Sequence, residues 1–216
     1  MSQKTDALIA SLSEGLEPTP PGAVTRRIAI GLGAGGLVSA VLMIVWLGVR
    51  PDLAQAMTTP MFWVKFAYAA LAGLALALAL SRLARPGARV GALAVLAAAP
   101  FVLMALMAAG RLTMAEPGTH HALLMGASAK VCAYRIYIIG LPLLTGAIWA
   151  VRGLAPTRLT LAGVVAGGCA GAISAVIYGF HCDETAAPFV AIWYTLGMAA
   201  VAVLGGLAGT RLLRWR

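Results

Sequence analysis

Long apolar runs separated by short polar segments make up most of this chain. A helix that crosses about 30 Å of hydrocarbon needs about 20 largely apolar residues, and six runs reach that length. The pattern therefore predicts an all-α membrane protein, a bundle of six transmembrane helices that follows an N-terminal tail. The predicted spans are Ile28–Val49, Met61–Leu80, Val90–Gly110, Val131–Val151, Leu159–Phe180 and Phe189–Thr210.

The composition excludes an ordinary water-soluble domain. Hydrophobic residues make up 61% of the chain and charged residues 11%, whereas a soluble domain has about 45–50% apolar and about 25% charged residues. A protein of this composition has too few polar side chains to cover its surface in water, so the lipid bilayer is its expected solvent. We expect two parts, a tail over residues 1–27 and a membrane domain over residues 28–216.

Positively charged residues are distributed unequally between the two predicted sides. The tail, the loops at 81–89 and 152–158, and the C-terminus together hold eleven Lys and Arg residues, and the other side holds five. Since cytoplasmic loops carry the excess of Lys and Arg, both termini are predicted to lie in the cytoplasm. This bias accounts for most of the net charge of +9, so no direct contact with nucleic acid is predicted. Tyr178 and Tyr194 fall near the outer interface, where aromatic side chains form belts.

The tail contains a short amphipathic pattern. Leu8, Ile9 and Leu12 fall on one face of a helix. Thr5 is the predicted N-cap, and Asp6 lies in the first turn, where the helix dipole favours an anion. An isolated helix of this length is marginal in water. Two interpretations stay open, a segment that folds into a groove on a soluble partner and a frayed tail.

The predicted spans contain little chemistry of their own. They hold no Asp, Glu or His at mid-depth, although transporters and proton relays usually carry ionisable residues along their path. The chain has no nucleophile elbow, no HExxH, no CxxC and no glycine-rich phosphate loop. Neither an enzymatic activity nor a cofactor is therefore predicted.

Glycines recur every four residues in two of the predicted spans. The fifth span has Gly163, Gly167 and Gly171, and the sixth has Gly205 and Gly209. Such stripes let helix backbones approach closely. Packing inside the bundle is the simpler interpretation, and a homo-oligomer stays open.

Two cysteines fall at the same predicted depth on the outer side. Cys132 begins the fourth span and Cys182 follows the fifth, whereas Cys169 lies about 20 Å deeper if its segment is helical. Lys130 and Arg135 stand close to Cys132 in sequence and are expected to favour a thiolate there.

The role of this pair stays open on the residues alone. A structural disulfide is reasonable in an oxidising compartment. A redox-responsive or metal-responsive pair is equally reasonable, with His181 beside Cys182 as a further candidate metal ligand to Cys132 and Cys182. The third interpretation is two unrelated interfacial cysteines.

Four motifs make the chain resemble a known family over essentially its whole length. They are Lys4-Thr5-Asp6-x-Leu8-Ile9-x-x-Leu12, Gly48-Val49-Arg50-Pro51-Asp52-Leu53, Phe62-Trp63-x-Lys65, and His181-Cys182-Asp183-Glu184-Thr185-Ala186-Ala187-Pro188-Phe189-Val190-Ala191-Ile192-Trp193-Tyr194. With these motifs the chain resembles the NrsF-type family of six-helix membrane anti-sigma factors from proteobacteria.

The resemblance implies a negative regulator that holds an extracytoplasmic-function sigma factor at the bacterial inner membrane. It also implies release of that factor under stress from oxidising heavy-metal species, through the outer cysteines that match Cys132 and Cys182. We expect the tail residues Thr5, Asp6, Leu8, Ile9 and Leu12 to contact the partner. The alternatives are a membrane thiol oxidoreductase, for which a second cysteine pair is missing, and a heavy-metal transporter, for which ligands inside the spans are missing.

Overall fold

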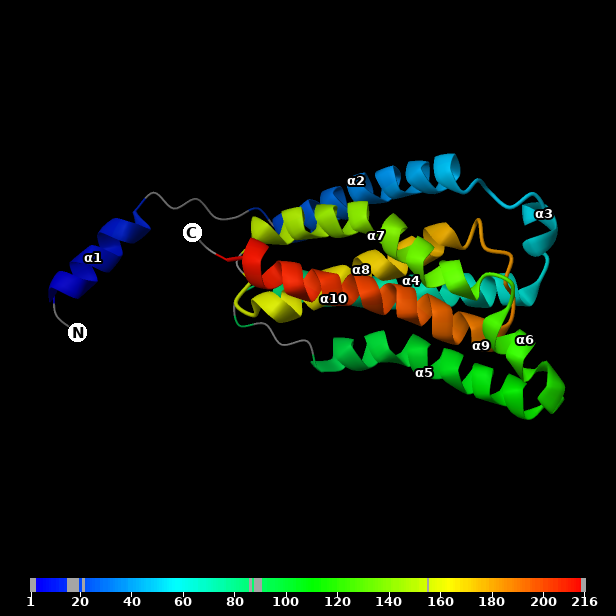
Figure 1. Ribbon diagram of the computed structural model, residues 1–216. Coiled ribbons are helices and arrows are strands. Elements are labelled where there is room, and N and C mark those ends of the chain that lie inside the picture. Colours follow the sequence, from blue (N-terminus) through cyan, green and yellow to red (C-terminus); the bar gives the residue numbers. More distant parts are fainter. Residues whose placement is uncertain are drawn as a thin grey trace.

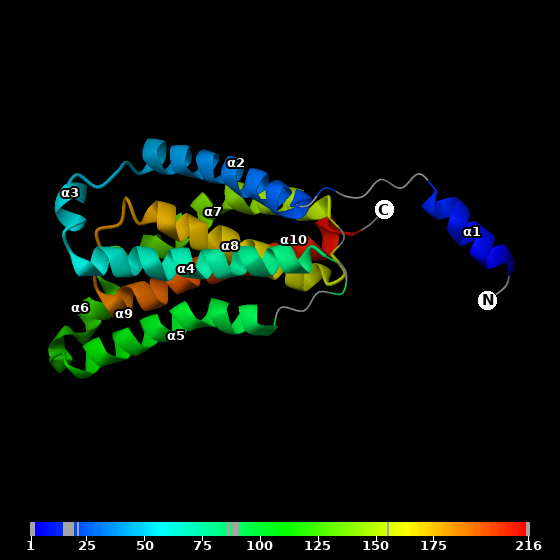
Figure 2. The ribbon, with the colours of Figure 1, turned by 180° about the vertical axis from the view of Figure 1, so that it is seen from behind.

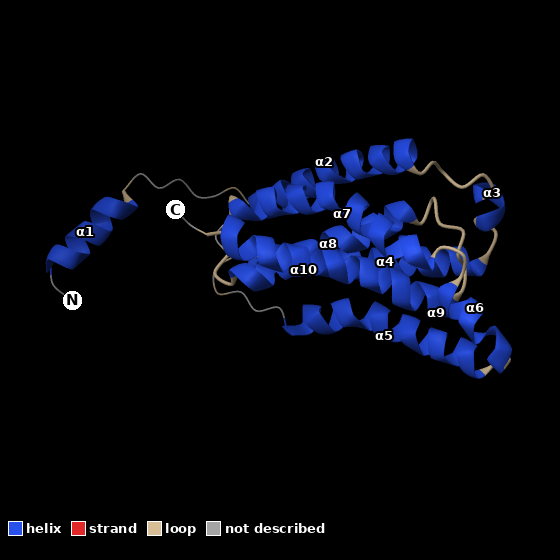
Figure 3. Ribbon diagram, viewed as in Figure 1, coloured by secondary structure: helices blue, strands red, loops and turns tan. Residues whose placement is uncertain are grey.

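The computed structural model describes residues 3–14, 20, 22–85, 87, 91–154 and 156–214, and within these ranges its regular structure is entirely helical (Figure 3). The elements are α1 Gln3–Ser13, α2 Ala23–Trp46, α3 Leu53–Ala56, α4 Pro60–Leu83, α5 Gly91–Thr113, the 3-10 turn η1 Pro117–Thr119, α6 His120–Met125, α7 Ala129–Arg152, α8 Leu159–Tyr178, α9 Ala187–Phe189, the π-helical turn η2 Val190–Tyr194 and α10 Thr195–Leu212.

Six helical stretches are long and apolar enough to cross a membrane, which confirms the six predicted runs. The fourth stretch comprises η1, α6 and α7, and the sixth comprises α9, η2 and α10. The fourth stretch begins at Pro117 rather than Val131, because η1 and α6 precede α7. In the first stretch, α2 begins at Ala23 rather than Ile28. Arg26 and Arg27 therefore belong to the start of this helix. The predicted start of the third span at Val90 lies outside the described residues.

Helix α8 is the centre of the bundle, and it packs against α10, α7 and α4. Helix α2 lies along α7 at one edge, and α5 lies along α4 at the opposite edge, as both views show (Figures 1 and 2). The short elements α3, α6 and α9 lie at the end of the bundle where α2 ends (Figure 1). Four parts of the chain therefore meet at this end of the bundle. They are the segments after α2 and after α8 and the segments before α4 and before α7.

The glycine stripes serve contacts inside the bundle. A Cβ atom on Gly163 of α8 would collide with the carbonyl oxygen of Gly205 on α10, and one on Gly167 would collide with that of Val201. The same close approach joins α2 to α7, where a Cβ atom on Gly31 would collide with the carbonyl oxygen of Gly146. These contacts confirm the interpretation of intramolecular packing.

The tail forms the helix α1, whose apolar side chains are exposed. Leu8, Ile9 and Leu12 are 58%, 51% and 68% exposed. Because the helix begins before Thr5, this residue lies inside the helix rather than at the predicted N-cap, and Asp6 lies in the first turn as expected. Most of the proline-rich segment that follows α1 lies outside the described residues.

Candidate functional site

Cys132 and Cys182 lie together at the end of the bundle where α2 ends. Cys132 is in the first turn of α7, and Cys182 follows the end of α8. Both are free thiols, both are buried, and they belong to one hydrophobic cluster. The two thiols are close enough to influence each other. The ends of α7 and α8 that carry the two cysteines thus lie together.

Glu184 fastens the segment that contains Cys182 to the start of α7. Its Oε1 accepts hydrogen bonds from the backbone N–H groups of Ala127 and Ser128, at 2.7 and 3.0 Å, and from the Ser128 hydroxyl at 3.1 Å. Gly126 makes room for this carboxylate, because a Cβ atom there would lie within 3 Å of it and because its φ of 50° suits glycine. Glu184 therefore holds the two cysteines close to each other, although neither cysteine takes part in its hydrogen bonds.

His181 connects the same segment to the end of α2 and to α7. Its Nδ1 lies 3.0 Å from the carbonyl oxygen of Gly48, and its Nε2 lies 3.2 Å from Nη1 of Arg135. Both ring nitrogens thus have protein partners. In the described ranges, no group of three or more His, Cys, Asp or Glu side chains is placed to hold a metal ion. The candidate ligands Cys132, Cys182 and His181 do not form a metal site in this arrangement.

Lys65 of α4 is a buried ammonium beside the thiol pair. The side chain is 2% exposed, and its Nζ donates hydrogen bonds to the carbonyl oxygens of Cys182 at 2.8 Å and Glu184 at 3.1 Å. No carboxylate in the described part of the chain forms an ion pair with it, because the one ion pair there joins Arg50 and Asp52 at 2.7 Å. Buried lysines are normally paired with a negative charge. A thiolate at Cys182, once formed, would supply that charge.

The surroundings of Cys182 favour its thiolate. A hydrogen bond from the Cys132 thiol lowers the pKa of the Cys182 thiol, the positive charge of Lys65 acts in the same direction, and burial opposes both. A thiol with a lowered pKa is the better nucleophile at neutral pH. Cys182 is therefore suited to attack an oxidant, and Cys132 is placed to complete a disulfide.

The cation beside the pair differs from the expected ones. Lys130 is exposed, and Arg135 is directed to His181, whereas Lys65 comes from a different span. The Phe62-Trp63-x-Lys65 motif was the only signal in the sequence for this residue.

Two tyrosines complete the wall around the thiols. Tyr178 and Tyr194 are fully buried rather than interfacial, and their ring centroids lie 5.9 Å apart. Their hydroxyl groups have no hydrogen-bond partner of ordinary geometry among the described residues. The Tyr178 hydroxyl lies beside the Cys132 thiol, and the Tyr194 hydroxyl lies beside the Cys182 thiol. These phenols are placed to donate hydrogen bonds to sulfur when a thiolate forms.

A small cavity of about 210 Å³ gives access to this region. Lys65, whose ammonium group contacts the carbonyl oxygen of Cys182, forms part of its wall. The lining side chains come from the segment after α2, the start of α4 and the segment after α8: Arg50, Asp52, Gln55, Ala56, Thr59, Phe62, Lys65 and Thr185.

Cys169 does not join the pair. It is fully buried in α8, and its thiol donates to the carbonyl oxygen of Gly73 on α4 at 3.6 Å. This position agrees with the packing role that its depth predicted.

Known proteins resemble this chain over nearly its full length. The family model described as "NrsF: Negative regulator of sigma F" matches residues 12–215. The chain is 43% identical over 212 residues to the anti-sigma-F factor NrsF of Caulobacter vibrioides, with 97% of each chain covered. It is 37% identical over 212 residues to the probable anti-sigma-F factor NrsF of Azospira oryzae, with 98% of this chain and 100% of that protein covered. No solved structure matches.

Proposed function

Because the chain belongs to the NrsF family of negative regulators of sigma F, we propose that it is a membrane anti-sigma factor whose Cys132–Cys182 pair controls release of the sigma factor. An anti-sigma factor acts by binding, so the role is regulatory rather than enzymatic. The observation that carries the proposal is the buried thiol pair beside Lys65.

We place the protein in the bacterial inner membrane with both termini in the cytoplasm. Six membrane-length apolar stretches and the unequal distribution of Lys and Arg support this orientation. Cys132 and Cys182 then lie at the periplasmic end, and α1 lies on the cytoplasmic side. The thiols and the tail are thus separated by the thickness of the bilayer.

The partner is an extracytoplasmic-function sigma factor, and α1 is its contact. Leu8, Ile9 and Leu12 present an exposed apolar face, which suits an amphipathic helix that docks in a groove. Thr5 and Asp6 lie near the start of the same helix.

The signal is a two-electron oxidation of the pair. The Cys182 thiolate attacks an electrophilic oxidant, and the Cys132 sulfur then displaces the reduced fragment, so that two thiols lose two protons and two electrons and one S–S bond forms. Heavy-metal species that oxidise thiols belong to this class of stress signal. Capture of a metal ion by the same thiols is less well supported, because both ring nitrogens of His181 already have partners.

A bond between Cys132 and Cys182 ties the start of α7 to the segment after α8. Because α7 and α8 pack along each other, a shift at the thiol end is transmitted to their opposite ends as a rigid-body movement. For oxidation to release the sigma factor, its binding free energies to the oxidised and reduced states must differ by a few kcal/mol.

The test is co-purification of the sigma factor with membranes that contain the full-length protein. We expect the sigma factor to remain bound under a reducing agent and to be released after treatment with diamide, which oxidises thiols to disulfides. A thiol oxidoreductase would instead give mixed disulfides with soluble proteins, and a metal transporter would retain no sigma factor. Failure to retain any sigma factor under reducing conditions would overturn the proposal.

A further inference from the structure

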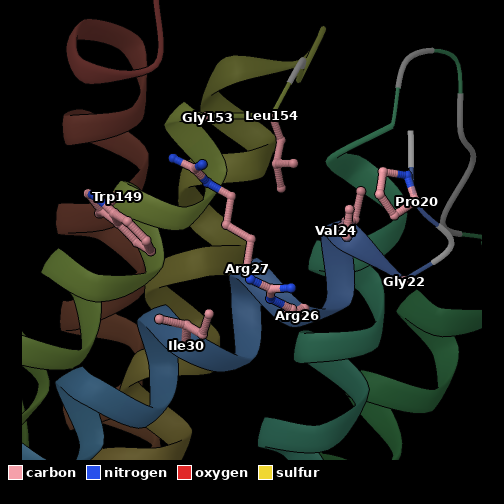
Figure 4. A pocket seen from close by; sticks show the side chains of 10 residues that line it. Pro20, Gly22, Val24, Arg26, Arg27, Ile30, Trp149, Gly153 and Leu154 are labelled. Carbon is pink, nitrogen blue, oxygen red and sulfur yellow. The ribbon is translucent and has the colours of Figure 1, made fainter. Parts of the chain in front are cut away.

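A larger cavity of about 620 Å³ lies at the end of the bundle away from the thiols, between the start of α2 and the end of α7 (Figure 4). Its lining includes two adjacent arginines and a tryptophan. The residues used below are Arg26, Arg27 and Ile30 of α2, Trp149 of α7 and Gly153 after α7.

Arg27 reaches across from α2 and is held against α7 (Figure 4). Its Nε donates to the carbonyl oxygen of Ala150 at 3.0 Å, and its guanidinium carbon lies 4.7 Å from the centroid of the Trp149 ring. Gly153 leaves the space for the guanidinium, because a Cβ atom there would collide with it. These contacts fix Arg27 in the cavity wall, and the N–H groups on its Nη atoms stay available to donate hydrogen bonds to a ligand.

The cavity is cationic, and no residue in the described part of the chain neutralises its charge. None of its lining residues is acidic, and neither Arg26 nor Arg27 forms an ion pair within the described ranges. Arg26 is exposed beside the fixed Arg27. The fixed guanidinium of Arg27 suits a phosphate group, which accepts paired hydrogen bonds from arginine, and Arg26 adds a second positive charge to the cavity.

The wall becomes apolar along the bundle from the arginines. Ile30 and Trp149 are 50% and 51% exposed, and α2 continues with the exposed apolar side chains of Leu37 and Val41. A cationic cavity followed by an exposed apolar face on a membrane-length helix matches a lipid with a charged head and an acyl chain. An acidic protein segment would fit the arginines but not this apolar face.

We propose that this cavity binds an anionic phospholipid of the cytoplasmic leaflet, with Arg26 and Arg27 on its phosphate and with Ile30 and Trp149 against its acyl chain. The proposal rests on the membrane placement given above. The lipid lies at the start of α2, next to the segment that leads to α1. Membrane charge then influences how the partner-binding tail leaves the bilayer.

The test uses full-length protein in phosphatidylcholine nanodiscs that contain spin-labelled phosphatidylglycerol, with the motionally restricted fraction measured by electron paramagnetic resonance. We expect restriction of phosphatidylglycerol in preference to spin-labelled phosphatidylcholine. Each of Arg26→Gln and Arg27→Gln should lower that preference about fivefold. Gly153→Ala should act like Arg27→Gln, because the new methyl group displaces the guanidinium. The matched control is Arg82→Gln, which removes an exposed arginine from the end of α4 and does not line the cavity.

Three outcomes would overturn the lipid assignment. The first is an equal loss in Arg82→Gln, which would indicate a general charge effect. The second is displacement of the labelled lipid by inorganic phosphate, which would show that the site takes a free anion. The third is loss of sigma-factor binding by the Arg26 and Arg27 variants in neutral detergent, which would show a protein occupant. Recovery of the protein in the soluble fraction would instead contradict the membrane placement itself.

Discussion

The ammonium of Lys65 donates a hydrogen bond to the backbone carbonyl of Cys182 at 2.8 Å, although 117 residues separate the two in the sequence. This bond brings the positive charge of α4 to the segment that carries the more acidic thiol. Because Lys65 is buried, solvent screens this charge much less than it would at an exposed position. The relationship makes the reactivity of Cys182 depend on a residue of another span.

Lys65→Met should therefore make Cys182 less reactive at neutral pH. The pKa of Cys182 in the folded protein is lowered, so its thiolate persists below the ordinary cysteine pKa of about 8.5 and is lost as the pH falls through the lowered value. Without the ammonium the pKa rises, and each unit of rise lowers the thiolate fraction at neutral pH about tenfold. The measurement is labelling by methyl methanethiosulfonate, followed by mass spectrometry across a pH series.

The matched control is Lys130→Met, which removes an exposed lysine close to Cys132 in sequence. Its labelling profile should remain that of the unaltered protein. Equal shifts in the two variants would show that total charge, rather than the buried contact, sets the reactivity of Cys182.

Serine substitutions should separate sensing from folding. Cys132→Ser and Cys182→Ser each keep a small polar group in the buried cluster but cannot form a disulfide. We expect each to leave repression intact and to abolish induction by chromate, which oxidises thiols, whereas Cys169→Ser, at a cysteine that contacts α4 instead of the pair, should do neither. The measurement is a reporter driven by a promoter of the sigma factor, with and without the stressor.

Two results would argue against this sensing role. Normal induction in both outer-cysteine variants would exclude the pair as the sensor. Constitutive expression of the reporter would indicate that the pair serves mainly to hold the fold together.

The six spans, and the placement of Cys132 and Cys182 at one end of the bundle, could be predicted from the sequence because both follow from local patterns. Each span is one continuous apolar run, and consecutive antiparallel spans have neighbouring ends. The order of the cysteines along the chain was therefore sufficient to bring them to one end of the bundle.

The surroundings of the pair could not be predicted in the same way. Lys65 and Glu184 reach it through tertiary contacts between distant segments. A lysine near the end of a span usually extends toward the headgroups, and tyrosines such as Tyr178 and Tyr194 at such positions usually belong to the interfacial belt. Burial of all three of these side chains depends on how four helix ends converge, which no local pattern specifies.

The α8–α10 contact gives a test of the bundle itself. Gly163→Ala places a methyl group against the backbone of Gly205, and because that backbone cannot move away cheaply the helices must separate. We expect a loss of about 1–3 kcal/mol in the free energy of unfolding. The measurement is thermal unfolding in detergent, followed by circular dichroism.

Gly33→Ala is the control for this substitution, because a Cβ atom at Gly33 of α2 has open space around it. It should be neutral or slightly stabilising, since alanine favours a helix over glycine. Equal destabilisation by both variants would mean that the close approach of α8 and α10 does not explain the effect, because Gly33 has no such neighbour.

The apolar face of α1 should decide partner affinity. Leu8→Asp puts a charge on the exposed face that also contains Ile9 and Leu12, and loss of a leucine contact at an interface costs about 2–4 kcal/mol. We therefore expect at least about thirtyfold weaker binding of the sigma factor and constitutive expression of its targets.

Ala7→Asp is the control, because it adds the same charge on the other side of this helix. This variant should bind the sigma factor normally, since its side chain is turned away from the face that contains Leu8. The measurement is co-purification with membranes, together with the amount of protein inserted. If both Leu8→Asp and Ala7→Asp retain the sigma factor, then α1 does not contact it. The contact must then come from the loops between the spans on the cytoplasmic side.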